Sequence, residues 1–222
     1  MTTIINASSS AGLVQTADTS AILQLQTGST AAVTIDASQN VTISKPVALS
    51  GSTSGAITLA APAVAGTNTA TLPAATGTVM VSGNMPAFSA YQSTTQSVNS
   101  GTFTKIQLQT EEFDTSSAFD STTNYRFTPQ VAGYYQVSGN VGYSFTIGQN
   151  VITVYKNGSR FKDGNFGAGG TDGAQSTVST LIYLNGSTDY IELWSYQNTG
   201  TAKSTTVGAG FTYFQAALVR TA

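Results

Sequence analysis

Acidic residues are the side chains of this sequence best suited to chemistry. The 222 residues include no histidine and no cysteine, which excludes zinc sites built on those ligands, thiol nucleophiles and Ser-His-Asp triads. The densest acidic cluster is Glu111, Glu112 and Asp114. Strand alternation would place Glu112 and Asp114 on one face, where their oxygens can converge on a calcium ion. The alternative is a solvated strand end that binds nothing.

A second pair of carboxylates, Asp163 and Asp172, flanks a loop in the glycine-rich stretch GNFGAGGTDG. Such a loop can hold an ion, contact a receptor through a side chain such as Phe166, or be a simple connection. Two acids can also serve a glycosidase, but nothing in the sequence fixes two carboxylates at the separation that this chemistry requires. We therefore predict no catalytic residue and no enzyme activity. We predict no cofactor, with calcium bound by Glu112, Asp114, Asp163 or Asp172 as the alternative.

Aromatic side chains offer a different chemistry, because they stack on sugar rings or become buried in a protein partner. In the sequence DYIELWSY, Ile191 and Leu193 alternate with Tyr190, Trp194 and Tyr196. If the aliphatic face is core, the aromatic face points outward. We predict that Tyr190, Trp194 and Tyr196 contact a receptor; the alternative is that another protomer or a covering loop meets them.

These side chains need a β scaffold, and the residue pattern predicts one. In RFTPQVAGYYQVSGNVGYSF, at 126–145, Pro129 marks a strand boundary, Gly133 permits a sharp turn, and apolar and polar residues alternate from Tyr135 onward. Asn157-Gly158 is the strongest hairpin signal, since a type I′ turn needs two residues that tolerate positive φ. With small and β-branched residues dominant and no long run of good helix formers, we predict an all-β protein.

Charge and composition divide the chain near Met85. The residues before it include only three charged side chains, whereas the single tryptophan and all ten tyrosines follow it. We therefore predict a β-rich shaft or attachment region at 1–84 and a β-sandwich or jelly-roll head at 85–222.

The first region contains five short alternating stretches, each with about two branched apolar side chains. A single copy could hardly bury enough apolar surface to offset its chain entropy. Either the region is a disordered linker or several chains share one core, and its low charge and regular apolar pairs favour the shared core. The five stretches are AILQLQT, AAVTID, NVTIS, GAITLA and GTVMVS.

Two parts of this region carry a resemblance to a known class of protein. They are ILQLQTGSTAAVTIDASQNVTI at 22–43 and SGSTSGAITLAAPAVAGTNTATLPAATGTVM at 50–80. Both resemble segments common in phage tail-fibre and other virion appendage proteins. The resemblance implies an intertwined, trimeric β-rich shaft or attachment region.

The second region carries another resemblance, in the order of its motifs. A Pro-Ala-Phe start is followed by GTFTK, EFDT, RFTPQVAGYY, VYKNGSR, DYIELWSYQ and an aromatic-rich closing strand. This order resembles the C1q-like globular head, a trimeric jelly roll of the tumour-necrosis-factor type. Two departures from the family pattern affect a loop and a packing position. The spacing from Phe119 to Phe127 is one residue longer than usual, and Leu108 stands where a Phe is common. Phe119, Phe127, Gly133 and Tyr135 match the central motif, whereas the closing Phe-x-Gly-x-Leu pattern reads Phe214, Ala216 and Leu218 here, with alanine in place of the glycine.

The inner sheet of that family lies at its trimer axis, so the resemblance implies that Phe211, Tyr213 and Gln215 lie in a trimer interface. Some C1q-like heads bind calcium, but no ligand motif carries over to this sequence.

Together these resemblances imply a homotrimeric virion protein, a tail fibre or a capsid-attached head fibre. Its first region would bind other virion proteins, and its head would bind a host-surface glycan or protein. The alternatives are a capsid decoration protein that stabilises the particle and a free C1q-like carbohydrate-binding module. A net charge of −2 disfavours nucleic acid as a partner. No apolar run approaches the ~18 residues of a membrane helix, and no secretory signal is predicted, because the first basic residue is Lys45.

Overall fold

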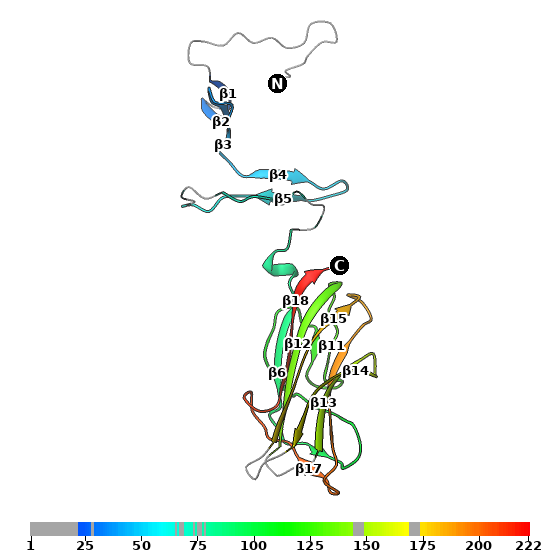
Figure 1. Ribbon diagram of the computed structural model, residues 1–222. Coiled ribbons are helices and arrows are strands. Elements are labelled where there is room, and N and C mark those ends of the chain that lie inside the picture. The colour runs from blue at the N-terminus through cyan, green and yellow to red at the C-terminus, as the bar shows by residue number, and fades with distance from the viewer. Residues whose placement is uncertain are drawn as a thin grey trace. The chain divides into compact units, whose positions relative to one another are not determined.

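The computed structural model describes residues 22–27, 29–64, 66, 69–72, 74, 77, 79–143, 149–168 and 174–222. The chain forms two compact units, Met1–Ala74 and Ala75–Ala222 (Figure 1). The predicted division between residues 84 and 85 lies inside the second unit, where Met80 packs against the hydrophobic core. Among the described residues, no helix is long and apolar enough to cross a membrane. The described part of the second unit contains one helical element, a short 3-10 turn, η1 (Ser82–Asn84).

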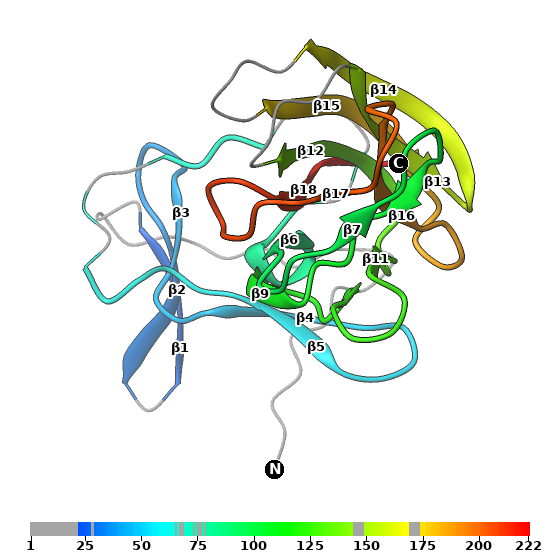
Figure 2. The same cartoon turned by 90° about the horizontal axis from the view of Figure 1, so that it is seen from below.

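The second unit is a sandwich of two antiparallel sheets, and it confirms the predicted all-β jelly roll (Figures 1 and 2). One sheet has five strands in the order β15-β12-β18-β6-β9; the other has six, in the order β10-β11-β16-β13-β14, with β8 paired to β16. The five strands are β15 (Ala174–Leu184), β12 (Gly133–Tyr143), β18 (Tyr213–Thr221), β6 (Ala87–Tyr91) and β9 (Thr110–Asp114). The six are β10 (Phe119–Asp120), β11 (Arg126–Phe127), β16 (Ile191–Gln197), β13 (Gln149–Lys156), β14 (Ser159–Ala168) and β8 (Thr104–Lys105). A further pair joins β7 (Ser97–Val98) and β17 (Lys203–Ser204).

Strand β12 lies between β15 and β18 in the five-stranded sheet and shows the expected alternation. Tyr135 and Val137 are buried, whereas Tyr134 and Gln136 are exposed. Gly133 begins the strand where β18 passes very close, since a Cβ there would lie 2.3 Å from the carbonyl oxygen of Arg220. Only glycine allows that approach.

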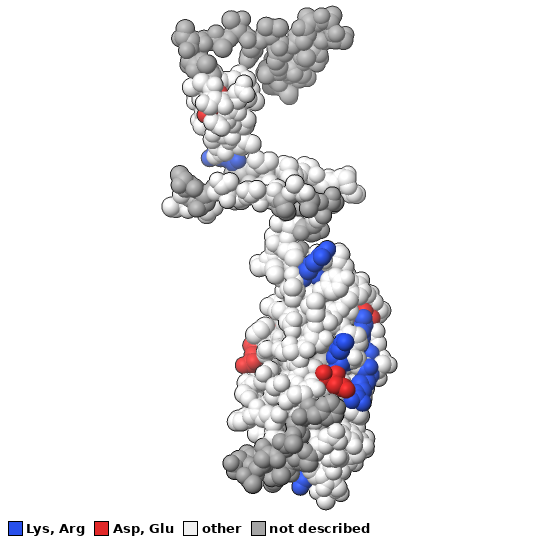
Figure 3. All heavy atoms as spheres, in the orientation of Figure 1, with Lys and Arg blue, Asp and Glu red and all other residues white. Residues whose placement is uncertain are grey.

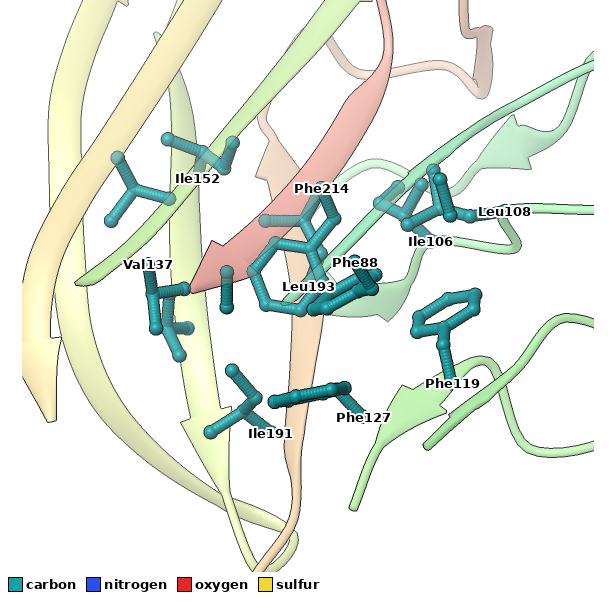
Figure 4. Packing of buried hydrophobic residues seen from close by; sticks show 14 of the residues in the cluster. Phe88, Ile106, Leu108, Phe119, Phe127, Val137, Ile152, Ile191, Leu193 and Phe214 are labelled. Atoms are coloured by element: carbon teal, nitrogen blue, oxygen red, sulfur yellow. The ribbon is translucent and has the colours of Figure 1, made fainter. Parts of the chain in front are cut away.

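The core between the sheets is built on stacked phenylalanine rings (Figure 4). The ring centroid of Phe88 lies 4.5 Å from that of Phe127, 4.7 Å from that of Phe119 and 5.5 Å from that of Phe214. Phe88 and Phe214 come from the five-stranded sheet, and Phe119 and Phe127 from the six-stranded sheet. The rings therefore join the two sheets directly.

The predicted hairpin at Asn157-Gly158 is confirmed. Asn157 and Gly158 have φ values of 52° and 75°, and they join β13 to β14. The Asn157 amide also donates to the Asp189 carboxylate (2.7 Å), and its oxygen accepts from the Tyr190 backbone N–H (2.9 Å). The hairpin is thus fastened to the start of β16.

The turn between β10 and β11 is closed by one carboxylate. Asp120 accepts backbone N–H donors from Thr123 (2.9 Å), Thr122 (3.0 Å) and Asn124 (3.1 Å), and the side-chain amide of Asn124 (2.7 Å). The Thr123 hydrogen bond is the largest of the effects that hold the pKa of Asp120 well below its usual value.

We expect this carboxylate to make the head less stable in acid. Because its pKa is depressed in the folded state, its contribution is present above about pH 4 and is lost as pH falls through the folded-state pKa. The free energy of unfolding of Asp120→Asn should therefore fall less between about pH 5 and about pH 2 than that of the wild type. Urea denaturation at several pH values tests this, and equal slopes would contradict it.

The first unit consists of a three-stranded antiparallel sheet and a separate hairpin. Four of the five predicted stretches contain strands; the fifth, GTVMVS, shows no strand in its described residues 77 and 79–82 and ends at η1. The structure adds a strand, β4, that the sequence analysis did not predict. The sheet comprises β1 (Leu23–Thr27), β2 (Thr30–Ile35) and β3 (Val41–Ile43); the hairpin comprises β4 (Val47–Ser50) and β5 (Ala56–Leu59).

Register places the branched apolar side chains of the sheet on one face, in two rows across the strands. The rows are Leu23–Ile35–Val41 and Leu25–Val33–Ile43. In the hairpin, Val47 and Leu59 form one pair and Leu49 and Ile57 another. We refer to these ten residues as the apolar rows.

The apolar rows are not covered. Leu25 is 51% exposed, Ile57 is 71% exposed, and no described residue of the first unit is buried. A half-exposed branched side chain forgoes on the order of 1 kcal/mol of burial energy. Several such side chains together forgo a large part of the ~5–15 kcal/mol that typically stabilises a domain.

Candidate binding surfaces

The acidic cluster of β9 bonds to the protein itself. The Glu112 carboxylate accepts from the Ser89 hydroxyl (2.7 Å), and the Asp114 carboxylate accepts from the backbone N–H groups of Ser116 (3.0 Å) and Phe119 (2.7 Å). Both carboxylates therefore have hydrogen-bond donors within the protein. The described residues contain no group of three His, Cys, Asp or Glu side chains that could hold a metal.

The glycine-rich stretch begins as strand rather than as loop, because β14 continues to Ala168 in pairing with β13. Asp163 lies in this strand and holds the Arg160 guanidinium at two points, 2.7 Å and 2.5 Å. Phe166 pairs with Val151 across the ladder, but its side chain lies outside the described part of the structure, as does all of Asp172.

The outward face of the six-stranded sheet carries an aromatic cluster, formed by Phe103, Tyr155, Trp194 and Tyr196. Ring centroids of Tyr155 and Trp194 are 4.4 Å apart with the planes inclined by 16°. Phe103 lies 5.1 Å from Tyr196 and 6.3 Å from Tyr155, again between ring centroids. All four side chains are half-buried. The rings form a continuous aromatic surface on the side of the sheet opposite the core.

Ion pairs border the aromatic cluster. The Glu192 carboxylate, only 5% exposed as a residue, accepts from the Lys105 ammonium (3.1 Å) and from the indole N–H of Trp194 (3.0 Å). The Arg160 guanidinium carbon lies 4.5 Å from the centroid of the Phe103 ring. Burial is the largest cause of a raised pKa for the Tyr155 phenol. The cluster therefore combines flat ring faces with charged groups at its edge.

The structure joins Trp194 to Tyr196 through Phe103 and Tyr155, and it places Tyr190 apart from them. Tyr190 lies under the Arg126 guanidinium, with the guanidinium carbon 4.4 Å from its ring centroid. Sequence reasoning identified neither Phe103 nor Tyr155 as a member of this surface. The strand pattern of VITVYK indicated that Tyr155 lies on a strand. Which side chains surround Tyr155 depends on the register between strands.

The outward face of the five-stranded sheet has a different character, with polar groups and exposed apolar side chains. Gln215 is exposed and Tyr213 half-buried, and a hollow of about 180 Å³ lies beside Gln215, Phe113 and Gln136. Phe211 lies before β18 rather than in it, because its backbone N–H bonds the Gly208 carbonyl in a turn (3.0 Å). Large apolar side chains at least 41% exposed on this face include Phe113, Tyr134, Leu181 and Tyr183.

Comparison with protein-family models and with curated protein sequences finds no match. Among solved structures, the chain is similar to Eiger TNF from S. frugiperda, with 8% identity and a TM-score of 0.49 over 62% of this chain and 93% of that one. It is similar to the globular domain of zebrafish complement 1qA, with 14% identity and a TM-score of 0.43 over 62% and 99%. It is also similar to the PRD1 vertex protein P5, with 20% identity and a TM-score of 0.45 over 61% and 97%.

Proposed function

We propose that this chain is a structural protein of a virus particle, a homotrimeric tail fibre or capsid-attached fibre. Its first unit attaches to other virion proteins, and its head, the second unit, binds a glycan or protein of the host surface. The likeness of residues 22–43 and 50–80 to appendage segments supports the virion assignment. The order of motifs in the head supports the trimer.

The observation that carries this proposal is the uncovered apolar surface in both units. The apolar rows of the first unit have no core to join. Exposed apolar side chains also stand on the five-stranded sheet, the face that carries Tyr213 and Gln215. Extended apolar faces of this kind mark association surfaces. Other copies of the same chain can cover the apolar rows, because every copy presents the same uncharged rows.

Within a trimer the six-stranded sheet faces outward in this proposal and offers the aromatic cluster to the host. Three heads on one fibre turn a weak contact into lasting attachment, because the second and third contacts form at high effective concentration. Adhesion of this kind needs no catalytic group.

Two measurements test the proposal. Light scattering should give the mass of a trimer, and an antibody against the head should label purified virions. A stable monomer would overturn the trimer, and recovery of the protein only in free form would overturn the virion assignment. Regular antibody labelling of the shell without any effect of soluble protein on adsorption would instead favour a decoration protein.

The aromatic cluster leads to a specific expectation for adhesion. Trp194→Ala removes the ring that stacks on Tyr155, and we expect binding of the full-length protein to host cells to fall about tenfold or more. Trp194→Phe keeps a flat ring and should retain most of the binding. Both are measured by competition with virion adsorption, at temperatures where circular dichroism shows each variant folded. Undiminished competition by Trp194→Ala would exclude the cluster as the contact surface.

A further inference from the structure

We infer that the outward face of the six-stranded sheet binds a neutral glycan, a chain of sugars without carboxylate, phosphate or sulfate groups. The aromatic cluster contacts the C–H face of a sugar ring, and polar groups at the edge of the cluster form hydrogen bonds with the sugar hydroxyls. The inference rests on the proposed role in adhesion and names the chemical class of the ligand.

The aromatic cluster points away from the core and is held in place before any ligand binds. The core side of β13 and β16 is filled by Ile152, Ile191 and Leu193, which are fully buried. Trp194 is on the opposite side of β16 and stays half-buried. Its indole N–H donates to the Glu192 carboxylate (3.0 Å), which fixes the orientation of the ring. A ring that is already fixed loses little conformational entropy when a ligand binds.

The charges on the outward face of this sheet cancel. Lys156 pairs with Ile191 and Lys162 pairs with Val154, so register places both lysines on the core side of their strands. Figure 3 shows basic and acidic side chains next to one another on the side of the head where Figure 1 places β13 and β14. The outward charged residues are the basic Lys105, Arg126 and Arg160 and the acidic Asp120, Asp163 and Glu192. With three charges of each sign, the face exerts no net attraction on a charged polymer.

Polar atoms at the edge of the aromatic cluster are available to a ligand. The Asp163 carboxylate accepts from Nε and Nη2 of Arg160, and within the described residues Nη1 of this guanidinium has no partner. The hydroxyl groups of Tyr155 and Tyr196 likewise form no hydrogen bond in the described part of the chain and are not fully buried. Sugar hydroxyls both donate and accept, so these N–H and O–H groups can bond to them.

These features together favour a neutral sugar over other ligands. A sugar ring has an apolar C–H face bordered by hydroxyl groups, and the outward face has aromatic rings bordered by polar groups whose charges balance. An acidic polysaccharide would find the cations beside the cluster already paired with Glu192 and Asp163. A protein partner would need a broader apolar surface, and each ring of the cluster is less exposed than Phe113 (51%) or Leu181 (53%) on the other sheet.

Trp194 is the single tryptophan of the chain, so its fluorescence reports on this site alone. The test titrates the full-length protein with maltohexaose, cellohexaose, mannohexaose and chitohexaose, with a hexamer of galacturonic acid as the charged comparator. We expect at least one neutral hexasaccharide to bind with a Kd of about 1 mM or lower, and the charged hexamer not to bind. A bound sugar excludes water from the indole, so the emission should move to shorter wavelength and quenching by acrylamide should fall. The affinity should change less than about twofold between about 50 mM and about 300 mM salt, because no net charge is involved.

Two variants of the site and one matched control complete the test. Arg160→Ala removes a hydrogen-bond donor at the edge of the cluster, and Tyr196→Ala removes one of its rings. Each should lower the affinity about tenfold, measured where circular dichroism shows the variant folded. Lys162→Ala removes an exposed cation of the same strand as Arg160, but from the core side, and should leave the affinity unchanged.

Three outcomes would overturn the inference: no fluorescence change with any neutral hexasaccharide, binding of the charged hexamer alone, or an equal loss with Lys162→Ala. Recovery of a host surface protein as the only ligand would overturn it as well. The proposed function fails separately, when soluble protein does not compete with virion adsorption. Competition without binding of a neutral sugar would therefore refute the ligand class and leave the adhesive role intact.

Discussion

Val33→Glu is expected to unfold the first unit of the protein. Val33 lies at the centre of an apolar row, between Leu25 and Ile43 on the neighbouring strands. If copies of the chain bury these rows against one another, a carboxylate there would have to be desolvated in their shared core. Backbone amides of β2 should then exchange with deuterium about 100-fold faster, or more, than in the wild type. Thr34→Glu, on the opposite face of the same strand, is the matched control and should have little effect.

The absence of cysteine permits a second check of the same contact. Val33→Cys introduces the sole thiol of the chain, and mild oxidation should join two chains through a disulfide if the apolar rows face each other. Thr34→Cys should stay reduced. Interchain bonds that form equally well at both positions, or at neither, would show that copies do not cover this face.

Phe88→Ala is expected to be the most damaging single change in the head. The Phe88 ring is 1% exposed and touches Phe119, Phe127 and Phe214, so its removal opens a cavity between the two sheets. Loss of a buried phenylalanine ring costs about 3–5 kcal/mol. Urea denaturation should show this decrease in the free energy of unfolding.

The matched control is Phe161→Ala, which removes a phenylalanine ring that is 41% exposed on β14. Its cost should stay within about 1 kcal/mol, as for most surface substitutions. A similar cost for the two variants would mean that the stack of phenylalanine rings does not hold the sheets together.

Local sequence patterns predicted much of the fold. Alternation identified β12, because successive side chains of a strand point to opposite faces. Asn157-Gly158 identified a hairpin, because few other pairs accept positive φ at both positions. The stretch GTVMVS has the same alternation but forms no strand in its described residues, and PVALS became β4 without being predicted. Such short patterns depend on whether a partner strand is available.

What the sequence determined by itself was the set of elements and the chemistry that it excludes: an all-β chain without histidine or cysteine. Tertiary structure alone decided which side chains meet. Phe103 precedes Trp194 by most of the head domain, yet both belong to one aromatic cluster, because β8 pairs with β16 and β16 pairs with β13. Likewise, alternation allowed Glu112 and Asp114 to share one face, whereas the donors that each carboxylate accepts from lie on different segments. Alternation along one strand fixes the side of a residue, whereas its neighbours across the sheet follow from register, which long-range packing sets.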